Sequence, residues 1–188
     1  HHIYGGRFRR TVGSIDQFVG ETGRTRRGTH HLRETLRLAT SATARTARRQ
    51  GIDPAFFPGS WHLTEQLPFD PDLIHLHNLH GHFFDIAALP TLTARAPAVW
   101  TLHDEWAFTG RCTWTLGCDR WRGRCGDCPQ IGTYLRPPDG TSAGLAAKAD
   151  SYARAQAHIV APSSWMLERA KDSVLGHLPM SLIPNGVD

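Results

Sequence analysis

The chain has 188 residues, of which 40% are hydrophobic, and this length suits one well-buried domain. Its formal net charge is only +4, and a pI near 9.2 does not by itself indicate nucleic-acid binding. No run of about 18 apolar residues is present, which excludes a membrane-spanning helix, and no secretory signal is recognisable at the start.

The N-terminal third of the chain has few regular patterns. Residues 1–28 are rich in glycine and arginine, and we predict a loop there with at most one edge element. The apolar spacing of residues 29–50 predicts a surface helix, with Gly51 where a C-terminal cap would lie. Beyond two prolines, residues 61–67 are predicted to form a short helix that precedes the first strand.

Two short apolar runs follow, at residues 73–77 and 98–103, and both are typical of buried parallel strands. Residues 83–94 between them predict a crossover helix. Because Pro90 lies inside it, we expect that helix to be kinked or split near Leu89. A right-handed crossover of this kind sets the two strands side by side or nearly so.

Helix and strand alternate again towards the C-terminus. We predict a helix at 142–156, a strand at 158–161, a helix capped by Ser163, and a strand at 180–183. The fold class expected from this alternation is α/β, a Rossmann-like parallel sheet flanked by helices. One long irregular segment, residues 104–140, interrupts the pattern and is crowded with Cys, Gly and Trp. Loops of that length in a compact domain are usually functional or internally cross-linked.

Polar residues follow the two runs of the predicted βαβ unit where the carboxyl ends of the strands would lie. They are His77, Asn78, His80 and Gly81 after the first strand, and His103 and Asp104 after the second. In open α/β sheets, ligands bind in the crevice outside the carboxyl ends of the strands. The sequence therefore predicts an active site at this edge of the sheet.

The histidines allow several interpretations. Alternate residues of a strand share a face, so His75 and His77 point to the same side. For His75, a buried sheet histidine held by backbone carbonyls weighs equally with a functional role. We expect His103 to hydrogen-bond a sugar hydroxyl or to stabilise charge, with its protonation tuned by Asp104 and Glu105. The alternative is a metal site with the ligands His77, His80 and His103.

The four cysteines of the chain all lie in the irregular segment, with the spacing C-x5-C-x6-C-x2-C. They are Cys112, Cys118, Cys125 and Cys128. Four thiolates can close a tetrahedral site around one structural zinc ion, and a C-x2-C pair has the spacing of a zinc knuckle. Two disulfides and free thiols are the alternatives, although the lack of a secretory signal favours reduced thiols.

Several segments, taken in order, resemble a bacterial family 4 glycosyltransferase of the exopolysaccharide or colanic-acid type. They are HLHNLHG at 75–81, WTLHDEWAFTG at 100–110, the cysteine segment through Gln130, APSSW at 161–165 and IPNGVD at 183–188. The resemblance runs from about residue 70 to the last residue, whereas residues 1–69 match weakly.

The resemblance implies a GT-B fold, in which two Rossmann-like domains face each other across a cleft. Residues 1–188 would form the acceptor-side domain, and residues 184–188 would begin the linker to a donor domain that is absent. The first residue is not Met, which also suggests a piece of a longer protein. No two glutamates lie eight positions apart, the spacing that the family uses in its donor domain.

By the same resemblance, the intact enzyme would be a retaining transferase. It would move a hexose from a UDP- or GDP-sugar to a growing, lipid-linked oligosaccharide in cell-surface polysaccharide synthesis. Its location would be the cytoplasm or the inner face of the plasma membrane, as a peripheral protein. The fragment alone is expected to be inactive.

Roles for individual residues are carried over only where the motifs match. The catalytic residues would be His103, which supports the sugar, and Asp104, which orients it. The substrate-binding residues would be His77, Asn78, His80, Gly81, Trp106, Thr109 and Gly110.

A second class of function competes with the transferase. A zinc-stabilised module could grip nucleic acid or an acidic glycan through arginines interleaved with aromatic residues. The residues in question are Arg111, Arg120, Arg122, Arg124, Trp114 and Trp121. The HxHNxxH segment ahead of the cysteines favours the transferase, with no nucleic-acid partner, because a binding module does not need it. An inactive scaffold subunit is a third interpretation.

Overall fold

The computed structural model describes residues 2–4, 16–18, 46, 49–51, 58–67, 69–80 and 84–186. Most of the helix predicted at 29–50 lies outside the described residues, but its end is described. The Gln50 amide donates to the carbonyl of Thr46 at 3.0 Å. Gly51 follows with a φ of 68°, the left-handed conformation that glycine adopts without strain at a helix C-terminus, as the sequence predicts.

Four parallel strands form the main sheet, in the order β3-β4-β5-β6. They are β3 (Ile74–Leu76), β4 (Ala98–Thr101), β5 (Ala157–Ala161) and β6 (Met180–Leu182). The register aligns Leu76 with Trp100, Trp100 with Ile159, and Ile159 with Met180. All four predicted strands are confirmed, and the first two lie side by side.

A second, two-stranded parallel sheet consists of β1 (His2–Tyr4) and β2 (Asp16–Phe18). The prediction of at most one edge element in residues 1–28 is therefore wrong. Each of these strands has three residues, which is too short to show the period of two that marks a strand in a sequence.

The crossover between β3 and β4 is split as Pro90 requires. A 3-10 helix, η3 (Ile86–Ala88), is capped by Asp85, whose side chain accepts from the Ala87 amide, and α2 (Leu89–Thr93) follows at once. Pro90 lies in the first turn of α2, where its missing N–H has no helical partner to lose. The single helix predicted at 61–67 is instead a pair of 3-10 helices, η1 (Pro58–His62) and η2 (Thr64–Gln66).

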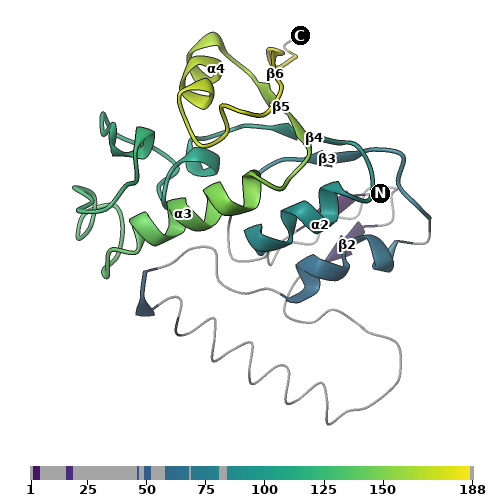
Figure 1. Cartoon of the computed structure of the whole chain (residues 1–188), viewed down its shortest axis with the longest axis horizontal. Helices are drawn as coiled ribbons and strands as arrows, with labels where there is room; N and C mark the ends of the chain where they lie inside the picture. The colour runs from purple at the N-terminus through teal and green to yellow at the C-terminus, as the bar shows by residue number, and fades with distance from the viewer. Residues whose placement is uncertain are drawn as a thin grey trace.

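Two longer helices complete the α/β unit: α3 (Thr141–Tyr152) and α4 (Ser164–Lys171). Ser163 caps α4 by accepting from the Met166 amide at 3.2 Å, as predicted. Figure 1 shows α2 and α3 along one side of the sheet and α4 beside β5 and β6. The structure is therefore a Rossmann-like parallel sheet flanked by helices, which confirms the predicted fold class.

The core lies between the sheet and the helices. Its largest buried side chains include Phe84, Trp100, Trp106, Phe108, Trp121, Tyr152 and Ile159. The rings of Trp100 and Tyr152 meet edge to face with centroids 5.6 Å apart, a favourable aromatic geometry. On α4 the buried residues are Met166 and Ala170, whereas Trp165 is 48% exposed.

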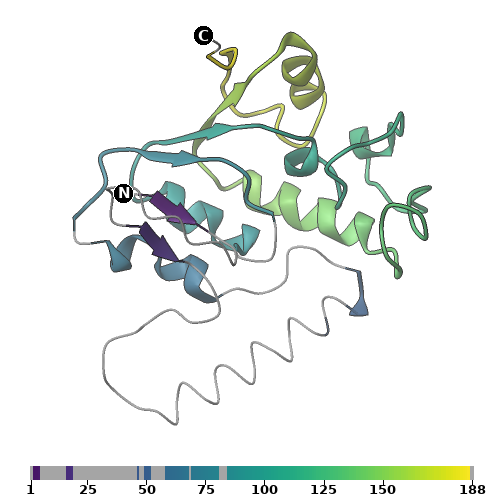
Figure 2. The same ribbon diagram turned by 180° about the vertical axis from the view of Figure 1, so that it is seen from behind.

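Residues 104–140 form the predicted irregular segment, which we call the cysteine loop. Its only helical turns are η4 (Trp106–Phe108) and η5 (Arg120–Arg122). Figure 2 shows it extending from the N-terminal end of α3. Its beginning is anchored to α3, because Tyr152 donates to the Ala107 carbonyl at 2.7 Å.

Candidate functional site

Two side-chain pairs join the carboxyl ends of β3 and β4. His77 Nδ1 lies 2.8 Å from His103 Nε2, and His80 Nε2 lies 2.8 Å from Asp104 Oδ2. Each pair takes one residue from each strand end, so the gathering that the sequence predicts at this edge is present. The chemical roles of these four residues stay predictions.

Buried tryptophans fix the backbone on which both pairs depend. The Trp100 indole, 2% exposed, donates to the His77 carbonyl at 2.8 Å. The Trp106 amide donates to Asp104 Oδ1 at 2.9 Å, and the Trp106 ring lies 5.6 Å from that of His80. The site side chains are therefore exposed or half-buried, while the groups that position them belong to the core.

His75 extends the cluster along β3. It shares a face with His77, with ring centroids 4.2 Å apart, while Leu76 between them is buried on the other face. The interpretation of His75 as a buried histidine held by backbone carbonyls is wrong, because it is exposed and its Nε2 lies 2.9 Å from Thr101 Oγ1. Thr101 was missed as a site residue. It lies two residues before His103, at the last position of β4, which is the signal that both side chains point to the same side.

The imidazole of His77 resists protonation. Burial lowers its pKa below the usual histidine value, and the nearby rings of His75 and His103 lower it further. Each of those rings, when charged, repels a charge on His77. His77 is therefore neutral at neutral pH, and it lies in contact with the ring of His103.

Neither carboxylate next to His103 in the sequence bonds to it. Asp104 is engaged by His80 and the Trp106 amide. Glu105 points into the interior, where it is 1% exposed. The turn after β4 thus sends the three side chains to different partners, and the expectation that Asp104 and Glu105 tune His103 stays a prediction.

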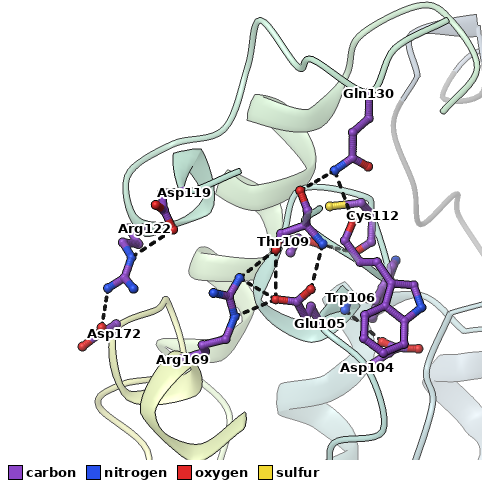
Figure 3. A network of polar contacts seen from close by, with 12 residues as sticks. Asp104, Glu105, Trp106, Thr109, Cys112, Asp119, Arg122, Gln130, Arg169 and Asp172 are labelled. Carbon is purple, nitrogen blue, oxygen red and sulfur yellow. Dashed lines mark hydrogen bonds and ion pairs between the residues drawn. The ribbon is translucent and has the colours of Figure 1, made fainter. Parts of the chain in front are cut away.

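Glu105 instead joins the strand end to the cysteine loop and to α4. Its carboxylate accepts from Arg169 Nε at 2.7 Å (Figure 3). It also accepts from the Thr115 amide at 2.7 Å. Arg169 Nη2 also donates to Thr115 Oγ1 at 2.8 Å. Sequence reasoning missed this network, since nothing in the pattern links a loop threonine to a helix arginine 54 residues away.

The other predicted substrate-binding residues differ in their exposure to solvent. Asn78 is exposed beside the two pairs. Trp106, Thr109 and Gly110 are buried, so they would affect a substrate only indirectly, by positioning the exposed residues of the site. A Cβ at Gly110 would lie 2.1 Å from the Thr141 carbonyl oxygen, which explains the glycine there. Gly81 lies outside the described residues.

The four cysteines are free thiols that line one small cavity in the cysteine loop. The cavity measures about 20 Å³, roughly the room of one water-sized sphere. Within the described part of the chain, no group of three or more His, Cys, Asp or Glu side chains is placed to hold a metal ion. Among the described residues, neither the cysteines nor the histidines are therefore arranged in advance as a metal site. Zinc binding at the cysteines stays a prediction.

The backbone around the last two cysteines is unusual. Cys125, Gly126 and Asp127 have φ values of 51°, 94° and 44°. Arg120 Nη1 donates to the carbonyls of Gly126 and Asp127 at 2.9 and 2.6 Å, which holds this left-handed turn. Burial raises the pKa of Cys112 to about 11 and also raises the pKa of Cys125, so in the absence of a metal both are protonated thiols.

Three of the side chains proposed for the competing binding module are engaged within the protein. Trp121 is 1% exposed and packs against Phe108, with ring centroids 5.2 Å apart. Arg122 pairs with Asp172 and Arg120 holds the loop carbonyls. These three side chains serve the structure of the loop, whereas Trp114 is 55% exposed, so the competing module stays an alternative.

Comparison with known proteins gives two matches. Residues 19–188 match the family described as Glycosyltransferase Family 4. The putative colanic acid biosynthesis glycosyl transferase WcaC of Escherichia coli (strain K12) is 30% identical over 131 residues, which cover 63% of this chain and 32% of that protein. The chain thus spans about a third of the length of the curated relative that it matches. No solved structure matches significantly.

Proposed function

This chain belongs to glycosyltransferase family 4, and we propose that it is the acceptor-side domain of a retaining transferase in bacterial cell-surface polysaccharide synthesis. The intact enzyme would move a hexose from a UDP- or GDP-sugar to a growing, lipid-linked oligosaccharide. The relative named for colanic acid biosynthesis supports a polysaccharide as the product class.

The observation that carries the proposal is the joining of two strand ends by polar pairs. The His77–His103 and His80–Asp104 contacts lie at the carboxyl edge of a parallel sheet, where α/β proteins bind ligands. In the proposed enzyme, His103 faces the sugar and supports charge that develops as the bond to the nucleotide breaks. Both oxygens of Asp104 are engaged, so Asp104 acts by orienting His80 and the following turn.

Substitution of His103 tests this function in the full-length transferase that contains this chain. His103→Ala should lower kcat on the order of a hundredfold or more, because a group that stabilises transition-state charge is lost. The melting temperature should change little, since His103 is exposed. His62→Ala is the matched control, because His62 is an exposed histidine of η1 outside the site. Normal turnover of the His103 variant would contradict the proposal, and steeply salt-dependent oligonucleotide binding would favour the competing module.

We also propose that one structural zinc ion binds the cysteine loop. The support is that all four thiols line one cavity of about the size of a single small sphere. Cys112, Cys118, Cys125 and Cys128 would supply four sulfur ligands, which leaves no open position for a catalytic water. The ion would act only by holding the loop together, with ligand binding and loop ordering coupled.

A peripheral contact with the inner face of the plasma membrane is part of the proposal. No helix in the described ranges is long and apolar enough to cross a membrane. Trp114, Leu116 and Tyr134 of the cysteine loop are 55%, 75% and 48% exposed, and such side chains partition into the headgroup region. Wild-type protein should sediment with anionic lipid vesicles and a Leu116→Ser variant should do so less. Equal sedimentation would contradict a role for this loop.

A further inference from the structure

The contact between His77 and His103 constrains how His103 can meet a substrate. An imidazole has two nitrogens, and His103 Nε2 lies 2.8 Å from His77 Nδ1. In a neutral ring one nitrogen donates and the other accepts, so the bond to one nitrogen decides which state the other adopts. Only the Nδ1 edge of His103 remains for another partner.

His77 is held firmly enough to impose that constraint. Its carbonyl accepts from the buried Trp100 indole, and its ring lies against His75. His75 is itself tied to Thr101 Oγ1. The position of His77 Nδ1 is therefore set by β3 and by the core beneath it, before any substrate binds.

The groups around the pair limit it to one positive charge. His75 faces His77 from the same strand, and the His80–Asp104 pair lies across the site. No carboxylate bonds to either ring of the pair, so two adjacent positive charges would repel without compensation. The lowered pKa of His77 agrees with this, and it leaves His77 as the neutral member.

We propose that His77 is a positioning residue for His103: its imidazole holds the Nε2 edge of His103 so that the Nδ1 edge alone faces the sugar. This inference rests on the proposed function. When the pair carries one positive charge, His103 is the imidazolium. It then donates from Nε2 to His77 and from Nδ1 towards the substrate. His77 itself does not touch the sugar.

Two near-isosteric variants separate this role from a general effect of charge or packing. The amide of asparagine lies near the position of histidine Nδ1, whereas that of glutamine lies near Nε2. In the full-length transferase, His77→Asn should therefore keep the bond to His103 and retain kcat within a few-fold of wild type. His77→Gln should lose the bond and lower kcat roughly tenfold to a hundredfold with little change in KM, because the reacting group is misplaced.

A measurement without turnover tests the same inference on the 188-residue chain. Nitrogen-proton correlation spectra of the imidazole rings report which nitrogen of His103 carries the proton and how the ring titrates. His103 should adopt one tautomer in wild type and His77→Asn, and a mixture of tautomers in His77→Gln. An unchanged His103 spectrum in His77→Gln would overturn the inference.

The kinetic results keep this inference distinct from the proposed function. If His103→Ala lowers kcat and His77→Gln does not, the transferase stands and the positioning role fails. If His103→Ala leaves kcat unchanged, the proposed function of the site fails. A His77→Gln/His103→Ala double variant should be no slower than His103→Ala alone, since His77 acts only through His103. An additional loss in the double variant would contradict the positioning role.

Discussion

Lys148 shows how a single buried charge supports the site from behind. It is fully buried in α3, yet its Nζ donates to the carbonyls of Trp106 and Thr109 at 2.5 and 2.9 Å. The ammonium also lies 3.5 Å from the centroid of the Trp106 ring, a cation–π contact. A buried ammonium is tolerated because its donors are used. It closes the turn that begins the cysteine loop, directly after Asp104.

Replacing this lysine should unfold the protein more readily. Lys148→Met keeps most of the volume but leaves the Thr109 carbonyl without its donor, at a cost of roughly 1 to 3 kcal/mol, and leaves the Trp106 carbonyl with the Thr109 amide alone. The free energy of unfolding, measured in urea, should fall accordingly. Lys171→Met changes the other lysine of the chain, which is exposed, and should shift that free energy by less than about 0.5 kcal/mol. Equal effects of the two substitutions would show that the buried contacts contribute little.

At the scale of elements, Glu105 and Arg169 join three parts that the sequence keeps far apart. The carboxylate follows β4, the guanidinium comes from α4, and Thr115 of the cysteine loop bonds to both. The Glu105 side chain is 2% exposed and that of Arg169 is 16% exposed, so water screens the ion pair weakly. Arg169 also lies over the Trp121 ring at 4.6 Å, which places the loop against α4.

Breaking this pair should cost far more than breaking a surface pair. Glu105→Gln leaves the Arg169 charge without its partner, and the loss of one member of a buried pair costs roughly 3 to 5 kcal/mol. Asp150→Asn is the matched control, because Asp150 pairs with Arg154 on the exposed side of α3 and such pairs contribute at most about 1 kcal/mol. Urea unfolding of both variants measures the difference. A loss below about 1 kcal/mol for Glu105→Gln would contradict a structural role for the network.

The cysteine loop gives the second prediction at this scale. Protein purified under reducing conditions should contain about one zinc ion per chain, measured by elemental analysis. Cys125→Ser should lose the ion and destabilise the loop by several kcal/mol, because metal binding is coupled to its ordering. Ser142→Ala, which alters an exposed residue near Gly126, should keep the metal. A folded wild-type protein with no metal and two intact disulfides would rule out the zinc site.

Elements with a strong local pattern could be predicted, and those that depend on register could not. The apolar runs ending at His77 and His103 indicated β3 and β4, and Pro90 indicated the split of the crossover. The sequence placed both histidines at one sheet edge, but their contact depends on the strand register, which no local pattern encodes. For the same reason the pattern did not show that Asp104 bonds to His80 and Glu105 bonds to Arg169. Proximity along the chain does not determine the direction of a side chain after a turn.

For the whole molecule, the proposed separation of acceptor binding from donor binding follows from the chemical groups that the domain presents. The described sheet edge presents imidazoles and one engaged carboxylate, which suit hydroxyl recognition and charge support. The paired glutamates that the family resemblance assigns to donor binding have no counterpart in this sequence. In the two-domain proposal, this domain would supply half of a cleft and a donor-side domain would supply the other half.

These 188 residues alone should accordingly transfer no sugar. Holding donor and acceptor in one geometry can lower a barrier by roughly 7 to 11 kcal/mol, and a single domain forfeits much of that advantage. A donor-side helix N-terminus that would bind the phosphates through its backbone amides would be missing as well. The check is chromatography of UDP- and GDP-sugars incubated with the purified chain, with His103→Ala as the control for contaminating host enzymes. Release of nucleotide at enzymatic rates that disappears in the variant would show that the chain is self-contained, and the two-domain proposal would be wrong.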